Sequence, residues 1–124
     1  MQKKHYTVFG YRGKQVRDNI HSVDLVNALY HFYKNPGVGK IYNIGGSRHS
    51  NSSILEAVKM CEDISGNALE WSHEDENRFG DHIWWVSDVS RFKADYPDWS
   101  YRYNMEGIIK EIYEGLRQRL SAAG

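Results

Sequence analysis

The chain has 124 residues, 40% hydrophobic and 26% charged, which is typical of one globular domain covering residues 1–124 rather than a disordered segment. Its 16 Lys and Arg balance its 16 Asp and Glu; because a basic excess supplies most of the affinity for nucleic acid and anionic membranes, we expect neither as a partner. The single cysteine, Cys61, excludes an intrachain disulfide and predicts a reducing, cytoplasmic location, and the sequence contains neither a membrane-length apolar run nor a signal-peptide core.

The N-terminal third predicts two strands followed by a helix. Tyr6–Phe9 is a short β-prone run, and after a turn the segment 14–20 is expected to return as an extended strand. Ser22 is expected to cap the helix, with Asp24 in its first turn, where the helix dipole favours an acid. The apolar residues of this helix recur at helical spacing: Val26, Leu29, Tyr30 and Tyr33. Pro36 and Gly37 end it.

The middle of the chain predicts a strand and a second helix. Lys40–Ile44 is a compact strand that reads as buried and parallel, although the chain offers it few partners. Ser53 and Glu56 have the spacing of a capping box, and Gly66 lies where a helix-terminating glycine belongs. The predicted apolar stripe of this helix is Ile54, Ala57, Val58, Cys61 and Ile64.

The C-terminal part predicts two short extended segments and two helices. Leu69–Ser72 alternates like a strand, 72–82 is a polar loop, and Ile83–Val86 is an apolar extended run. Asp88 is expected to cap a short helix to about residue 95, and Asn104 the last helix. The stripe of that helix is Met105, Ile108, Ile109, Ile112, Leu116 and Leu120.

The order of these elements predicts the fold class. Strands that alternate with helices indicate an α/β architecture, here with few strands and about four helices. There are too few strands for a complete doubly wound sheet, and the strand 40–44 lacks evident neighbours. We therefore expect the chain to be part of something larger.

Two arginines are candidates for binding an anion. Arg17 ends an extended segment and could fork onto two phosphate oxygens; the alternative is a surface ion pair with Asp18 or Asp24. Arg78 lies in a loop with a glycine nearby, so its backbone could approach a ligand closely, and Asp81 could accept hydrogen bonds from ribose hydroxyls. The alternative for this loop is that it is simply solvated.

Three further features are weaker candidates. Backbone amides at Gly45–Gly46 could hold an anion, although a tight turn explains the pair equally simply. The histidines and carboxylates of 73–82 could be read as metal ligands, but they lack the His-x-x-x-His spacing of zinc hydrolases and are expected to be solvated. Cys61 lies on a helix stripe and is expected in the core rather than as a nucleophile.

The order of the motifs along the chain is more specific than any one of them. YTVFGYRGKQVRDNIHSVDLVNALYHF, then IYNIGG, then RFGDHIWWVSD resembles the C-terminal part of the NAD-dependent epimerase/dehydratase family, extended short-chain dehydrogenases acting on nucleotide sugars. GKQVRDNIH is most similar to the CDP-paratose (CDP-tyvelose) 2-epimerase branch. The resemblance runs from about residue 6 to the last helix. It implies a partial Rossmann-like, substrate-side domain.

The resemblance also implies roles for individual residues. Arg17 would contact the nucleotide diphosphate. Arg78 and Asp81 would contact phosphate and ribose, and Thr7 and Phe9 would line the base. No residue of the chain is expected to be catalytic or to bind a metal.

The sequence departs from the family in ways that affect catalysis. The Gly-rich NAD motif G-x-x-G-x-x-G is absent, and so is the catalytic Tyr-x-x-x-Lys with its upstream Ser or Thr. Tyr30 and Lys34 have that spacing, but Tyr30 belongs to an apolar stripe and Lys34 to a helix end. Asn19 replaces an aromatic residue of many 4-epimerases, which weakens the carry-over from UDP-sugar enzymes. Because NAD carries the hydride chemistry in the full-length family, we expect this chain to bind no cofactor and to be inactive alone.

Three functional hypotheses remain. The leading one is a substrate-side segment that binds a CDP- or UDP-linked sugar and requires an N-terminal half for catalysis. The second is a non-enzymatic homo-oligomer or interaction module, in which a second chain completes the late-sheet strand. The third is a small metalloenzyme built on the loop 73–82.

Overall fold

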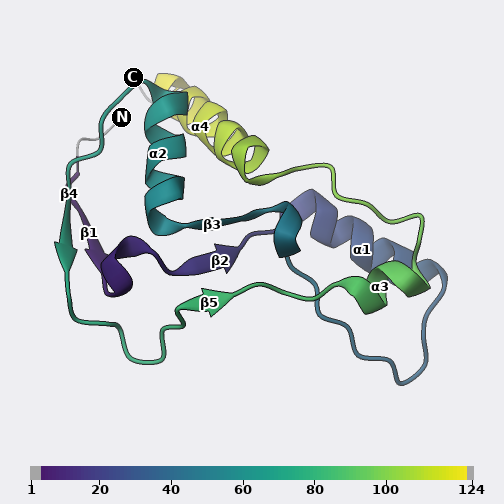
Figure 1. Cartoon of the computed structure of the whole chain (residues 1–124). Helices are drawn as coiled ribbons and strands as arrows, with labels where there is room; N and C mark the ends of the chain where they lie inside the picture. The colour runs from purple at the N-terminus through teal and green to yellow at the C-terminus, as the bar shows by residue number, and fades with distance from the viewer. Residues whose placement is uncertain (1–3, 123–124) are drawn as a thin grey trace.

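Short strands and helices alternate through residues 4–122, the part of the chain that the computed structural model describes (Figure 1). The strands are β1 (Tyr6–Phe9), β2 (Val16–Asp18), β3 (Asn51–Ser53), β4 (Trp71–Glu74) and β5 (Trp84–Trp85). The helices are α1 (Ser22–Lys34), α2 (Ile54–Ser65), α3 (Ser90–Asp95) and α4 (Met105–Ala122), with single 3₁₀ turns at Tyr11–Gly13 and Ser47–His49. The predicted α/β class with few strands and four helices is confirmed.

The strands form two small sheets rather than one. β1 and β4 pair in parallel, with Tyr6 opposite Trp71 and Phe9 opposite Glu74. β2 is the middle strand of the second sheet, antiparallel to β3 and parallel to β5. Figure 1 shows β2 running between these two neighbours. The segment that contains the candidate Arg17 is therefore held on both sides by hydrogen-bonded strands.

The predicted strand Lys40–Ile44 does not join a sheet. Its side chains alternate as in a strand: Tyr42 and Ile44 pack towards the core, whereas Ile41 is 79% exposed and Asn43 is exposed. Within residues 4–122, however, no strand pairs with it. The prediction of a sheet strand is wrong for this chain, because strand propensity needs a neighbouring backbone to pair with.

An aromatic core lies between α1 and α3. Its buried residues are Ala28, Phe92, Tyr96 and Trp99. Tyr42 packs on Phe92 edge to face with ring centroids 5.3 Å apart, and its hydroxyl donates to Asp95 Oδ2 at 2.6 Å. Lys40 Nζ lies 2.7 Å from the same oxygen, and these two hydrogen bonds hold the pKa of Asp95 below its usual value. The extended segment 40–44 is thereby fixed to α3.

The apolar stripe predicted for α1 faces solvent instead of the core. Its four residues, Val26, Leu29, Tyr30 and Tyr33, are between 55% and 76% exposed. The helix reaches the core through Ala28 and Asp24, which are both buried. Helical periodicity identifies an apolar face but not what covers it, and among the described residues nothing buries this one.

Cys61 is another corrected prediction. The thiol lies on α2, which packs against α4, but the residue is exposed rather than part of the core. Partial burial of its sulfur, followed by the charge of Glu62, raises the pKa of the Cys61 thiol.

Helix ends follow the local signals closely. The capping box is confirmed: Glu56 N donates to Ser53 Oγ at 3.2 Å, and Ser53 N donates to Glu56 Oε2 at 2.7 Å. Asn104 Oδ1 accepts from Gly107 N at 2.9 Å at the start of α4, as predicted. The predicted cap at Ser22 is wrong by one position, because His21 Nδ1 accepts from Val23 N at 3.1 Å.

Candidate functional site

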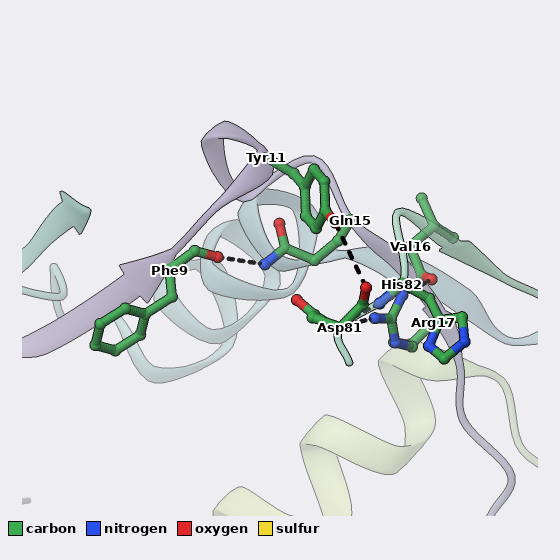
Figure 2. A network of polar contacts seen from close by, with 7 residues as sticks. All are labelled: Phe9, Tyr11, Gln15, Val16, Arg17, Asp81 and His82. Atoms are coloured by element: carbon green, nitrogen blue, oxygen red, sulfur yellow. Dashed lines mark hydrogen bonds and ion pairs between the residues drawn. The ribbon is translucent and has the colours of Figure 1, made fainter. Parts of the chain in front are cut away.

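The candidate site lies where the arm formed by β1, the turn 11–13 and β2 meets the loop after β4 (Figures 1 and 2). Arg17 is the central residue of β2, in register with Ser52 on β3 and Trp85 on β5. Its side chain is 31% exposed, and that of Asp81 in the loop is 24% exposed. The fold therefore brings together two of the five predicted site residues from distant parts of the chain.

Arg17 is bonded to Asp81. One terminal nitrogen, Nη2, forms an ion pair with Asp81 Oδ1, and the other, Nη1, donates to the Val16 carbonyl at 2.7 Å (Figure 2). The same carboxylate oxygen accepts from His82 N at 3.0 Å. The Tyr11 hydroxyl donates to the Asp81 carbonyl at 3.4 Å, which links the loop to the arm. Asp81 thus occupies the place that the surface-pair alternative gave to Asp18 or Asp24.

Arg78 and Phe9 form a second contact. The guanidinium carbon of Arg78 lies 4.6 Å from the centroid of the Phe9 ring, a cation–π geometry. The Phe9 carbonyl accepts from Gln15 Nε2 at 2.8 Å, which ties the end of β1 to the arm. In Figure 2, Phe9 lies at one end of this group of residues and Arg17 at the other. Thr7, the remaining predicted residue, is two residues before Phe9 on β1 and pairs with Ser72 of β4.

Gln15 is a polar residue of the site that the sequence did not single out. The residue is only 6% exposed, and its Oε1 has no hydrogen-bond partner among the described residues. Glutamines are usually exposed, so nothing in the sequence apart from its place in the arm marks this one.

The backbone amide that follows the glycine pair Gly45–Gly46 is already hydrogen-bonded to a carboxylate of the chain. Ser47 N donates to Asp18 Oδ2 at 2.8 Å, and Ser87 N donates to the same oxygen at 3.0 Å. The Tyr101 hydroxyl donates to the Gly45 carbonyl at 2.6 Å, and burial raises the pKa of Tyr101 to about 12. Asp18 therefore fixes the end of β2, next to Arg17, to two other segments.

Asp24 and His21 contact residues that hold the fold together and not residues of the candidate site. The fully buried Asp24 accepts from Arg102 N at 3.0 Å and from Tyr103 N at 3.1 Å. The His21 ring stacks on Tyr103 at 3.9 Å between centroids, and its Nε2 lies 2.8 Å from Glu111 Oε2. Both residues connect the start of α1 to the segment before α4, and His21 also reaches α4 itself.

The amide that follows the glycine pair 45–46 is already bonded, and no metal centre is found among the described residues. An NAD pyrophosphate needs free amides at a Gly-rich strand-to-helix loop, whereas the amide after Gly46 is bonded to Asp18. No group of three or more His, Cys, Asp and Glu side chains within residues 4–122 is arranged to hold a metal ion. In the same part of the chain, no helix has the length and apolar character needed to cross a membrane.

Several solved structures share this fold. UDP-glucuronic acid 4-epimerase from Bacillus cereus, in complex with UDP-glucuronic acid and NAD, superposes with a TM-score of 0.79 at 24% identity, over 90% of this chain and 35% of that one. UDP-glucose 4-epimerase from Thermotoga maritima, with UDP-glucose, gives 0.76 at 23% identity, over 95% of this chain and 36% of that one. Each match covers about a third of the solved chain, so the likeness shows the fold of that part alone.

One curated relative belongs to the enzyme branch that the sequence of the arm predicted. The chain is 27% identical over 113 residues to CDP-paratose 2-epimerase from Salmonella typhi, which covers 90% of this chain and 32% of that protein. No family model matches the chain. The resemblance to the C-terminal part of NAD-dependent epimerases and dehydratases is confirmed. The chain spans about a third of the length of these relatives.

Proposed function

We propose that the chain binds the nucleotide-sugar substrate of an NAD-dependent epimerase or dehydratase and is not catalytic by itself. The observation that carries the proposal is the contact of Arg17 with Asp81 beside that of Arg78 with Phe9, at the junction of arm and loop. The likeness to enzymes whose structures hold UDP-sugars and NAD supports the same assignment. A cytoplasmic location is part of the proposal, because the lone Cys61 is a free thiol.

The ligand would lie along the row from Phe9 to Arg17. The forked guanidinium of Arg17 suits two oxygens of a diphosphate, and Arg78 would supply a second positive charge. Asp81 would accept hydrogen bonds from the ribose hydroxyls, and Phe9 with Thr7 would line the base. A CDP- or UDP-linked sugar carries all of these groups: a diphosphate, a ribose with two hydroxyls and a base.

Calorimetry on the full chain with UDP-glucose and CDP-glucose tests the proposal. We expect Arg17→Ala to weaken binding of either ligand by at least about tenfold, because it removes charge-assisted hydrogen bonds to phosphate. Lys14→Ala is the matched control: it removes one positive charge from the same arm, and Lys14 is exposed. Absence of binding at millimolar ligand, or equal affinity of the Arg17 variant and the wild type, rejects the proposed site.

A partner is also part of the proposal: a polypeptide that carries the NAD site on a parallel sheet. The segment 41–44 is extended yet unpaired with any described strand, and the stripe of α1 is exposed. Together they present an open strand and an apolar helix face, the two features by which an α/β layer is usually completed. The two-thirds of the relatives that lie outside the match are long enough to contain such a sheet.

Amide hydrogen exchange tests this partner. In the chain alone, the amides of Tyr42, Asn43 and Ile44 are expected to exchange freely, because no neighbouring strand protects them. Co-expression with a polypeptide that carries the NAD-binding sheet of such an enzyme is expected to slow them by about a hundredfold or more, with no change in α2. If the chain alone protects these amides and scatters light as a dimer, the homo-oligomeric alternative is correct instead.

A further inference from the structure

We infer that Asp81 makes the Arg17 site selective, because it blocks Arg17 against simple anions until a ligand supplies both phosphate and vicinal hydroxyls. This inference rests on the proposed nucleotide-sugar function and specifies how that site discriminates among ligands. The observation behind it is that two residues expected to contact different parts of one ligand are bonded to each other.

Both terminal nitrogens of Arg17 already have acceptors. Nη2 is paired with the Asp81 carboxylate, and Nη1 donates to the Val16 carbonyl at 2.7 Å. The two side chains are 31% and 24% exposed, so solvent screens the pair less than it would a fully exposed one. A free phosphate or pyrophosphate that binds the remaining N–H donors of Arg17, or that displaces the carboxylate from it, lies next to the negative charge of Asp81. Repulsion between these like charges disfavours such ligands.

The Asp81 carboxylate is held in its blocking position by its own loop, because His82 N donates to its Oδ1 at 3.0 Å and the loop backbone is itself fixed. Asp81 N donates to the Arg78 carbonyl at 3.1 Å, and Gly80 between them has a φ of 78°, which glycine adopts readily. The backbone of the loop is linked to the arm by the Tyr11 hydroxyl. The carboxylate therefore stays beside Arg17 when a ligand enters, and the ligand must provide it with new hydrogen-bond donors.

A ligand with vicinal hydroxyls satisfies both partners. Its phosphate oxygens replace the carboxylate on Arg17, and its two hydroxyls donate to the two oxygens of Asp81. An inorganic anion satisfies only Arg17 and leaves a partly buried carboxylate without its partner, which is costly. The pair thus excludes the abundant simple anions and admits nucleoside diphosphates.

Calorimetry with sodium pyrophosphate and with UDP, on the full chain, tests this inference. We expect Asp81→Asn to bind pyrophosphate at least about tenfold more tightly than the wild type and to bind UDP no more tightly, so that selectivity is lost. Asp75→Asn is the matched control, because Asp75 is an exposed acid of the same loop and its loss changes the net charge equally. The double variant Arg17→Ala/Asp81→Asn is expected to lose the increase in pyrophosphate affinity. That loss would show that the increase depends on Arg17.

Three outcomes decide between the inference and the proposed function. If Asp81→Asn changes pyrophosphate affinity by less than twofold, or Asp75→Asn raises it equally, the blocking role of Asp81 is wrong even where UDP binds. If the wild type does not bind UDP while Asp81→Asn gains Arg17-dependent pyrophosphate binding, the blocking role holds and the nucleotide site is rejected. If the wild type binds UDP, and pyrophosphate affinity rises tenfold in Asp81→Asn but not in Asp75→Asn, both the nucleotide site and the blocking role of Asp81 are supported.

Discussion

Replacing Asp24 with alanine is expected to lower the free energy of unfolding by about 3 to 5 kcal/mol, because it leaves the backbone N–H groups of Arg102 and Tyr103 without their charged acceptor. The two carboxylate oxygens of this fully buried residue accept separately from Arg102 N and Tyr103 N, at 3.0 and 3.1 Å. The Asp24 carboxylate therefore joins α1 to the segment before α4.

Urea unfolding followed by tryptophan fluorescence measures this effect. Trp99 is a suitable reporter, because its indole Nε1 donates to the Asp24 carbonyl at 3.1 Å and the ring lies in the aromatic core. Asp24→Asn is expected to fall between the alanine variant and the wild type, since an amide keeps one acceptor oxygen. Asp98→Ala removes an exposed acid next to Trp99 and is expected to change stability by less than about 0.5 kcal/mol. A loss below 1 kcal/mol for Asp24→Ala contradicts the role given to it here.

The features that the sequence predicted correctly are determined within a few residues. Ser53 and Glu56 are three positions apart on one helix end, so their two hydrogen bonds follow from helix geometry alone. Asn104 and Gly107 have the same relation at the start of α4. The family resemblance predicted the fold of nearly the whole chain, because it rests on the order of many residues and not on single spacings.

The features that the sequence did not predict depend on residues far apart in the chain. The acceptor for Arg17 is 64 positions away, and its identity follows from where the loop after β4 returns to the arm. Asp24 looked like a helix-dipole residue because its true partners, the amides of 102 and 103, have no side-chain signature. Periodicity located the apolar face of α1 correctly but could not say that no described residue covers it.

Close backbone packing around Gly46 allows a test of how rigidly the end of β2, the strand that carries Arg17, is held. A Cβ atom on Gly46 would lie 2.1 Å from the Asn19 carbonyl oxygen and 2.4 Å from the Ser50 carbonyl oxygen. Both are backbone atoms, and Asn19 N donates to that Ser50 oxygen at 2.8 Å, just after β2 ends and just before β3 begins. Neither oxygen can move aside without disturbing the strand that carries Arg17.

Gly46→Ala is therefore expected to destabilise the chain by about 3 kcal/mol or more, as overpacking against a rigid backbone does. The same chemical change at Gly115 is the control, because that glycine lies within α4 and has open space around it. Gly115→Ala is expected to stabilise the chain by about 1 kcal/mol, since alanine is the better helix former. Thermal unfolding of both variants should thus give shifts of opposite sign. Equal shifts would mean that the turn at Gly46 relaxes easily, and the precise placement of Arg17 beside Asp81 would lose its structural basis.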